Sequence, residues 1–336
     1  MGPDCGTSIV SGVPICFANV VRSGKIGIVG ASGTGIQQVS TLIHQLGQGV
    51  SHAIGVGGRD PSDDVGGITT KMALELLDND ADTDVIALLS KPPGANTLKA
   101  ITEQIGTLAK PVIVSFLGQG SSTLASVKNV AGTLEEAATM AVALVTGRHP
   151  SSFTLFQRQM PPEFMERAQT LRTSGRKHLR ALYAGGTLAA EALNLLGESV
   201  GNIAYNELKN VGHAVVDLGD DQFTQGRPHP MIDPSYRTDM LMEQWADPAV
   251  GVILFDIILG YGGHMNPAEP VVRAIEKART EYGDRVTVIA TICGTDQDPQ
   301  NILAQEGLLK NAGVFLFPTN AYAVEAAAQL LARSVG

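Results

Sequence analysis

The sequence has few of the features that anchor or staple a chain outside the cytosol. Only three cysteines occur among its 336 residues, which predicts neither a disulfide framework nor a thiolate metal site. The sequence has no apolar run of about 18 residues, the length of a membrane-spanning helix. It also has no basic start followed by an apolar run, so no signal peptide is expected. The sequence favours a reducing, cytoplasmic setting without membrane contact.

Positive charge is also scarce. Lys and Arg total 24 against 33 Asp and Glu, which leaves a net charge of −9. A nucleic-acid binder needs a basic footprint, whereas the densest basic group here, 172–180, is short and resembles a linker or a solvated helix face. Hydrophobic residues make up 44% and charged residues 17%. These values exclude a disordered chain, and the length fits about two domains.

Short apolar runs alternate with helical patterns along both halves of the chain. Thr133 with Glu136 forms a capping-box pattern before the last helix of the first half. The Pro- and Ser-containing segment 148–178 interrupts the alternation and is interpreted as a linker. Alternating strands and helices predict parallel sheets covered by helices on both faces. The expected strands are 25–30, 52–57, 85–90 and 111–117, then 179–184, 214–218, 250–258, 286–292 and 314–317.

A glycine-rich turn follows the first of these strands and opens a helix. Free backbone N–H groups at such a turn make it a candidate anion site; the alternative is a plain capped turn. The turn lacks the G-x-G-x-x-G order, the Lys of a P-loop and the last Gly of a nucleophile elbow. The candidate anion-binding residues here are Ser32, Gly33, Thr34 and Gly35.

Other candidate residues follow the expected strands in the same way. Arg59 and Arg227 each come after a glycine and could clamp an anion as catalytic residues, or form structural ion pairs. His229 is the third candidate catalytic residue, and the acidic loop around it is expected to be solvated rather than to bind a metal. The other candidate anion-binding residues are Gly57, Gly58, Lys91, Gly185, Gly186, Thr187, Gly262 and Gly263.

Several strings resemble one family. Gly2–Gly6, the run 24–29 and Ser32-Gly33-Thr34 resemble the succinyl-CoA synthetase α subunit, with its G-P-N-C and K-G-x-I-G-I-V-x-x-S-G-T patterns. Residues 226–233 and 258–263 resemble the C-terminal domain of the β subunit. This α-like then β-like order over nearly the whole chain closely resembles FdrA proteins.

The resemblance implies a fold of two flavodoxin-like, succinyl-CoA synthetase-like parallel-sheet domains in tandem. It implies that 1–24 is the remnant of a preceding Rossmann-like, CoA-binding-type domain, which the chain would lack. Residues 25–147 would be the α-subunit-like domain, and 179–336 the β-subunit-like CoA-ligase domain. The stretch 120–132 matches the place of the phosphorylated histidine of the synthetases but holds no histidine, so no phosphohistidine is expected.

The resemblance also implies a function. FdrA-type proteins are associated with oxamate carbamoyltransferase in purine-ureide catabolism. Phosphate or carbamoyl phosphate would bind between opposed helix N-termini, in a homodimer or a complex with other subunits. One alternative is an ADP-forming acyl-CoA ligase that uses CoA, ATP and Mg²⁺; another is a non-catalytic assembly subunit. Outside the ligase alternative no cofactor is expected.

Overall fold

The computed structural model describes residues 5–119, 121–153, 158–209 and 211–331. The chain divides into two compact units. Unit 1 comprises residues 1–155 with Gly260–Gly262, and unit 2 comprises 156–259 with 263–336. The division falls within the segment 148–178.

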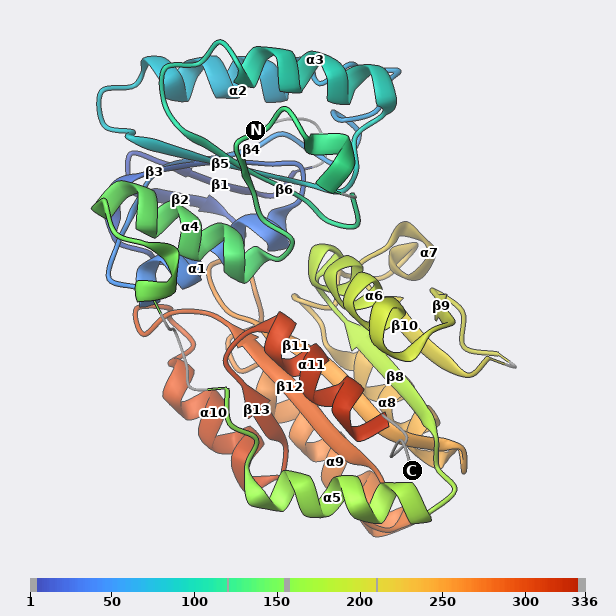
Figure 1. Ribbon diagram of the computed structural model, residues 1–336. Helices are drawn as coiled ribbons and strands as arrows, with labels where there is room; N and C mark the ends of the chain where they lie inside the picture. Colours follow the sequence, from blue (N-terminus) through green and yellow to red (C-terminus); the bar gives the residue numbers. More distant parts are fainter. Residues whose placement is uncertain (1–4, 120, 154–157, 210, 332–336) are drawn as a thin grey trace. The chain divides into compact units, whose positions relative to one another are not determined.

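Unit 1 is a seven-stranded sheet with the order β2-β1-β4-β3-β5-β6-β7. Helices α2 and α3 cover one face, and α1 and α4 the other (Figure 1). Val29, Leu88 and Val114 of the sheet pack in one core with Leu74 and Ile101 of the covering helices. Its elements are β1 Thr7–Val10, β2 Val13–Cys16, β3 Ser23–Gly30, α1 Gly33–Gln45, β4 Val50–Gly55, α2 Ile68–Asn79, β5 Val85–Ser90, α3 Ala95–Ile105, β6 Val112–Phe116, η1 Ser121–Leu124, β7 Asn129–Val130, α4 Leu134–Thr146 and η2 Pro150–Ser152.

Unit 2 is a six-stranded sheet with the order β13-β12-β11-β8-β10-β9. Helices α5, α6 and α11 lie on one face and α8, α9 and α10 on the other (Figure 1). Trp245, fully buried, packs among the apolar residues of β11 and α9. Its elements are α5 Pro162–Thr173, β8 His178–Tyr183, α6 Gly186–Val200, β9 Ile203–Tyr205, β10 His213–Asp217, α7 Asp221–Thr224, α8 Ser235–Ala246, β11 Val250–Ile258, α9 Ala268–Tyr282, β12 Thr287–Cys293, α10 Ile302–Asn311, β13 Phe315–Phe317 and α11 Asn320–Leu331.

The two units share one topology. In each, the first parallel strand (β3 or β8) lies centrally, with β4 or β10 paired on one side and β5 or β11 on the other. This is the flavodoxin-like order 2-1-3-4-5, to which unit 2 adds the short parallel strand β9 at the edge beside β10. The predicted α/β fold of two parallel-sheet domains is therefore confirmed.

Two predicted features differ in detail, and a third is confirmed. Within 1–24, residues 7–16 form the β1–β2 hairpin, and β1 joins the sheet antiparallel to β4. Residues 162–173 of the expected linker form helix α5, because Phe164 is buried edge-on against Phe315 and Phe317. The capping box is confirmed: Thr133 Oγ1 accepts from the Glu136 N–H, and Glu136 Oε2 from the Gly132 N–H.

Candidate functional site

The candidate site of unit 1 lies at the carboxyl ends of its parallel strands. Between β3 and β5 the strand order reverses, and at such switch points open α/β sheets bind their ligands. The β3–α1 turn ends at the N-cap residue Ser32, and Gly33, Thr34 and Gly35 begin α1. Lys91 directly follows β5. The topology thus brings Lys91 and the turn to one edge, with Gly57, Gly58 and Arg59 after β4.

The β3–α1 turn is shaped for a close backbone approach. A Cβ at Gly33 would lie 2.6 Å from Thr7 Oγ1 of the hairpin, so a larger residue does not fit. Ser32 is the N-cap residue in extended conformation, and its hydroxyl makes no capping hydrogen bond to α1. Gly57 has φ +88°, a conformation that favours glycine. The turn therefore brings the N-terminus of α1, whose first N–H groups have no acceptor within the helix itself, to this edge of the sheet.

The sequence analysis did not single out Ser90. This last residue of β5 is 6% exposed, and its hydroxyl is buried without a hydrogen-bond partner. It lines a narrow gap with Ala31 of the β3–α1 turn and Pro93 of the β5–α3 loop. A buried hydroxyl without a partner is uncommon. The sequence did contain a signal for Ser90, because it is a polar residue at the end of an apolar strand and directly before Lys91.

The two cationic candidates of unit 1 are exposed, whereas their neighbour Asp60 is structural. Arg59 and Lys91 are both exposed at this edge. Asp60 is buried and accepts hydrogen bonds from the N–H groups of Thr69 and Thr70, at 2.8 and 3.0 Å. Its carboxylate thus occupies the N-terminus of α2. The Asp60 side chain therefore caps α2, whereas the N-cap residue Ser32 makes no side-chain capping hydrogen bond to α1.

In unit 2 a carboxylate holds the corresponding glycine turn. Asp256 of β11 is fully buried and accepts hydrogen bonds from the N–H groups of Ala184 and Gly185, at 2.7 and 2.8 Å. Arg237 of α8, also buried, pairs with the same carboxylate at 3.2 Å. Burial raises the pKa of the Asp256 carboxyl, and these donors oppose the increase. The Gly185 N–H is thus bound within the protein.

A second carboxylate stands at the start of α6. A Cβ at Gly186 would lie 2.5 Å from Asp217 Oδ2. Asp217, at the end of β10, also accepts from the Gly219 N–H at 3.0 Å. Burial raises the pKa of Tyr205, with contributions from Asp217 and Asp220. Negative charge at this helix N-terminus is favourable electrostatically, but it disfavours a second anion at Gly186 and Thr187.

The predicted catalytic residues of unit 2 are placed as follows. The exposed guanidinium of Arg227 stacks over the Tyr236 ring at 4.0 Å. His229 is half-buried, and its Nδ1 accepts from the Met231 N–H at 3.2 Å. Burial lowers the pKa of His229, and Arg237 adds to the decrease. The neutral ring therefore carries its proton on Nε2, beside Gly219.

Gly262 and Gly263 lie on either side of the division between the units. Gly262, at φ +80°, belongs to unit 1 next to Phe17, and Gly263 belongs to unit 2. That the two edges face one anion, with these candidate residues as its ligands, stays a prediction. Residues 2–4 of the Gly2–Gly6 motif and residue 120 of the stretch 120–132 lie outside the described residues.

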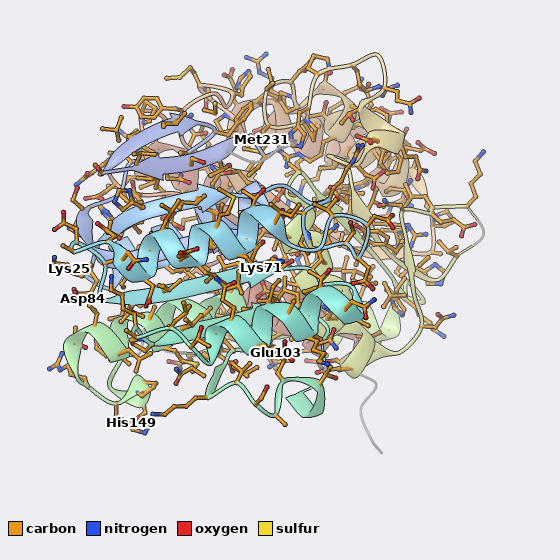
Figure 2. The ribbon with its side chains drawn as sticks, turned by 90° about the horizontal axis from the view of Figure 1, so that it is seen from above. Lys25, Lys71, Asp84, Glu103, His149 and Met231 are labelled. Atoms are coloured by element: carbon orange, nitrogen blue, oxygen red, sulfur yellow. The ribbon has the colours of Figure 1, made fainter. Side chains whose placement is uncertain are left out.

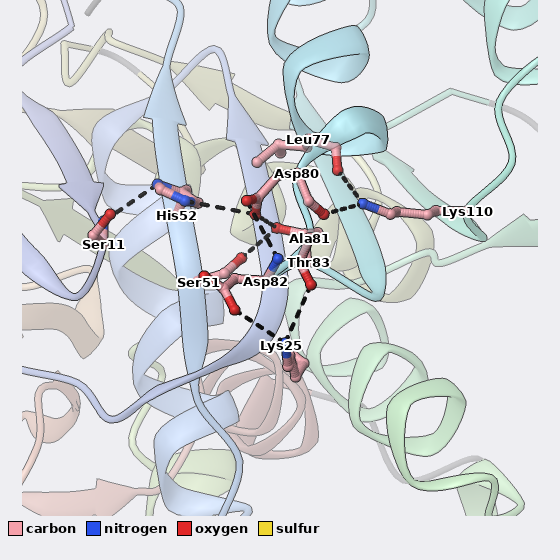
Figure 3. Close-up of polar contacts among 10 residues, drawn as sticks. All are labelled: Ser11, Lys25, Ser51, His52, Leu77, Asp80, Ala81, Asp82, Thr83 and Lys110. Atoms are coloured by element: carbon pink, nitrogen blue, oxygen red, sulfur yellow. Dashed lines mark hydrogen bonds and ion pairs between the residues drawn. The ribbon is translucent and has the colours of Figure 1, made fainter.

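A polar cluster occupies the opposite, amino edge of the unit 1 sheet (Figure 3). Ser51, His52 and Asp80 come together there, but they do not form a nucleophilic triad. His52 Nδ1 accepts from the Ser11 N–H at 3.2 Å, and its Nε2 lies 3.6 Å from Asp80 Oδ2. The Ser51 hydroxyl instead contacts Thr83 Oγ1 at 2.6 Å. A triad requires the hydroxyl on a histidine nitrogen.

This cluster fastens the turn between α2 and β5. Thr83 donates to Asp80 at 2.6 Å, which is the main reason that the pKa of Asp80 is lowered. Lys110 donates to the backbone oxygens of Leu77 and Asp80, and Lys25 pairs with Asp82 at 3.2 Å. These charges have partners within the protein, so the cluster is structural.

Among the residues that the structure describes, no group of three or more His, Cys, Asp or Glu side chains is placed to hold a metal ion. Within the same described ranges, every helix is too short or too polar to cross a membrane.

Two family models match the chain. Residues 182–330 match the CoA-ligase family, and residues 21–118 match the CoA-binding domain. The CoA-ligase match covers most of unit 2 and begins within β8. The CoA-binding match covers most of unit 1. The prediction that the chain lacks a CoA-binding-type domain is wrong, because the central strands and the β3–α1 turn of unit 1 themselves match that model.

Two curated proteins are similar to the chain, and one of them is a subunit of a CoA ligase. The uncharacterized protein YahF of Escherichia coli (strain K12) is 40% identical over 332 residues, which cover 94% of this chain and 64% of YahF. The α subunit of an ADP-forming succinate–CoA ligase from Aquifex aeolicus is 31% identical over 121 residues, 35% of this chain and 38% of that subunit. The chain thus spans less than two thirds of these relatives. Over parts of its length the chain is therefore similar to proteins of the CoA-ligase class.

Solved structures resemble the chain only weakly. A dinucleotide-forming acetyl-coenzyme A synthetase of Ca. Korarchaeum cryptofilum is 15% identical with a TM-score of 0.34, covering 98% of this chain and 69% of that chain. ATP citrate lyase from Methanothrix soehngenii is 13% identical with a TM-score of 0.31, covering 93% and 50%. Similarities of this size support no structural conclusion.

Proposed function

We propose that the chain is a group-transfer subunit that binds phosphate or carbamoyl phosphate at the carboxyl edge of unit 1. The observation that carries the proposal is the composition of this edge. A glycine turn presents the first N–H groups of α1, the unpartnered hydroxyl of Ser90 lies beside it, and exposed Arg59 and Lys91 follow the neighbouring strands. Such a set of donors suits a small, doubly charged anion.

The reaction proposed is that of the FdrA type. A phosphate oxygen attacks the carbamoyl carbon of oxalurate and forms a C–O bond. The bond from that carbon to the oxamate nitrogen breaks, and this nitrogen takes up a proton. The products are carbamoyl phosphate and oxamate. No phosphohistidine is needed, so positioning and charge stabilisation by Ser32, Gly33, Arg59 and Lys91 would carry catalysis.

For unit 2, taken by itself, we propose Arg227 and His229 as the residues that bind substrate. The Arg227 guanidinium is exposed and stacked, which leaves its N–H edge able to bind a carboxylate of oxalurate or oxamate. His229 carries its proton on Nε2, from which it would donate a hydrogen bond to the leaving nitrogen, while the proton that this nitrogen takes up comes from the attacking hydrogen phosphate. We propose the homodimer or hetero-complex from the resemblance to FdrA proteins, and the cytoplasmic setting from the presence of only three cysteines in the sequence.

The second candidate function is that of an ADP-forming acyl-CoA ligase subunit. The two family matches favour it, because both models describe CoA proteins. The exposed cations Arg59 and Lys91 and the α1 N-terminus also fit the phosphates of CoA or ATP. Formation of a thioester would be the chemistry that CoA supplies when bound. The chain would in this case work with a nucleotide-binding subunit.

Thermal unfolding with phosphate, carbamoyl phosphate, oxamate, ATP, ATP with Mg²⁺ and CoA separates the two candidates. A ligand at 100 times its Kd stabilises by about 2.7 kcal/mol, a shift of a few degrees at this chain length. Stabilisation by phosphate and carbamoyl phosphate, but not by CoA, is the expected result. Stabilisation by CoA or ATP alone would favour the ligase. A chain that no anion stabilises would contradict both.

A matched pair of variants tests the site itself. Lys91→Met removes an exposed cation at the carboxyl edge, and Lys99→Met removes one from the outer face of α3. We expect Lys91→Met to weaken phosphate binding about tenfold or more, since charge-assisted hydrogen bonds contribute about 1.5–3 kcal/mol. Lys99→Met should leave it unchanged. Equal effects of the two variants would mean that phosphate binds elsewhere.

A further inference from the structure

Helix α2 of unit 1 exposes an apolar stripe. Ile68, Met72 and Leu76 are 57%, 58% and 62% exposed. They follow one another at intervals of four residues, so they form one line along the helix. The opposite side of α2, with Ala73, Leu74 and Leu77, is buried on the sheet. Large apolar side chains lined up on a surface mark an interaction site more often than scattered ones do.

The charges beside the stripe are arranged for a partner with the same sequence. Lys71 and Glu75 lie one turn apart on a single flank of the stripe, by the helical period of 100° per residue. Among the contacts of the described residues, neither side chain has an ion pair, although i,i+4 pairs form at Lys99–Glu103 and Glu306–Lys310. Figure 2 shows α2 beside α3, with Lys71 labelled on α2 and Glu103 on α3.

We propose that α2 packs antiparallel against α2 of a second copy of this chain. A two-fold axis at Met72 places Ile68 opposite the partner's Leu76, and Leu76 opposite the partner's Ile68. The same axis brings Lys71 to within two residues of the partner's Glu75 along the shared flank, and Glu75 equally near the partner's Lys71. A two-fold contact must be self-complementary in this way. The apolar line and the alternating charges of α2 both meet that condition.

This surface is separate from the carboxyl edge of unit 1, so the proposal does not depend on the proposed function. Burial of the three apolar side chains drives the association, and the charges set the antiparallel register. A contact through one helix pair is small beside stable interfaces of about 800 Å² per partner. The dimer is therefore expected to be concentration-dependent.

Sedimentation velocity over a range of concentrations tests the apolar part. The wild-type chain should associate to a dimer, and Met72→Lys should raise the dissociation constant by about tenfold or more. Val13→Lys is the matched control, because Val13 is 61% exposed on the β2 edge of the same unit. It should dimerise as the wild type does. A monomeric wild type, a dimeric Met72→Lys or a dimer broken by Val13→Lys would each overturn the proposal.

Charge reversal tests the register. Lys71→Glu and Glu75→Lys each place like charges together in a homodimer and should each weaken it about tenfold. The double variant Lys71→Glu/Glu75→Lys restores opposite pairs and should dimerise like the wild type. An equal mixture of the two single variants should form a heterodimer. Far-UV circular dichroism confirms the fold of each variant. Failure of both the double variant and the mixture to recover would overturn the antiparallel register.

Discussion

Units 1 and 2 build the same turn between a central strand and a helix, but they satisfy it differently. In unit 1 the N–H of Ala31, after β3, donates to the backbone oxygen of Leu89 at 3.0 Å. In unit 2 the N–H of Ala184, after β8, donates to the side chain of Asp256. Leu89 and Asp256 occupy corresponding places on β5 and β11. The acceptor for the turn of unit 2 is therefore a buried carboxylate, whereas the acceptor in unit 1 is the backbone oxygen of an apolar residue.

The same contrast holds on the other side of the central strand. Asp217 ends β10, whereas Gly55 ends β4. A Cβ at Gly55 would collide with Cys5 Sγ and Thr7 O of the N-terminal segment, so no carboxylate fits there. The same topology thus gives two different carboxyl edges. In unit 2 the edge is occupied by acidic side chains, and in unit 1 it carries glycines, a hydroxyl group and exposed cations. Equal folds need not have equal binding capacity.

The largest expected effect comes from the charge pair of unit 2. Arg237→Met leaves a buried carboxylate without its cation and should destabilise by about 3–5 kcal/mol. Asp256→Leu, which introduces the residue of unit 1, should cost at least as much, because two N–H groups also lose their acceptor. Urea unfolding followed by Trp245 fluorescence measures both, since this sole tryptophan lies in unit 2.

The double variant Arg237→Met/Asp256→Leu should cost less than the sum of the single changes. Arg273→Met is the control: Arg273 is paired with Glu269 on the surface and 74% exposed, so its loss should be within about 1 kcal/mol of neutral. Additive single effects would mean that the buried pair is not coupled.

A smaller effect is expected on acidification. Burial lowers the pKa of His178, His213 and His229, all in unit 2. Unfolded imidazoles titrate near pH of about 6.5. Below that pH the unfolded chain binds protons that the native rings do not, so unit 2 loses stability. In unit 1 the pKa of Asp80 is lowered, so its ionised carboxylate stabilises the folded state above about pH 3.9. This contribution is lost only as the pH falls below that value.

The urea concentration at the midpoint of the Trp245 transition should therefore decrease when the pH is lowered from about 7.5 to about 5.5, measured in buffers of about equal ionic strength. His213→Asn keeps an acceptor for the Leu179 N–H but does not titrate, so its midpoint should fall less. A midpoint independent of pH in this window would contradict the assignment of neutral histidines.

The smallest effect concerns the last helix of each unit. Thr133 caps α4 through the Glu136 N–H, and Thr319 accepts from the Tyr322 N–H at the start of α11. Thr133→Ala and Thr319→Ala should each cost about 1 kcal/mol. Because Trp245 lies in unit 2, only Thr319→Ala should shift its transition if the units unfold separately. Equal shifts would show that they unfold together.

Much of the fold followed from local sequence signals. The apolar runs predicted the buried strands, the glycine turns predicted where helices begin, and Thr133 with Glu136 predicted the capping box. The candidate site was less predictable. Asp256 was missed, although a single carboxylate inside the apolar strand Val250–Ile258 was a usable signal. Ser90 was missed because only the neighbouring β3–α1 turn makes its hydroxyl stand out.

The sequence by itself determined the alternation of strands and helices, since burial periodicity and turn residues act within about ten neighbouring residues. It also determined which turns carry glycine. Only the tertiary structure decided which of these turns is held by a carboxylate. That depends on the strand placed beside it: Asp256 lies 71 residues from Gly185 along the chain and reaches its N–H through the pairing of β11 with β8.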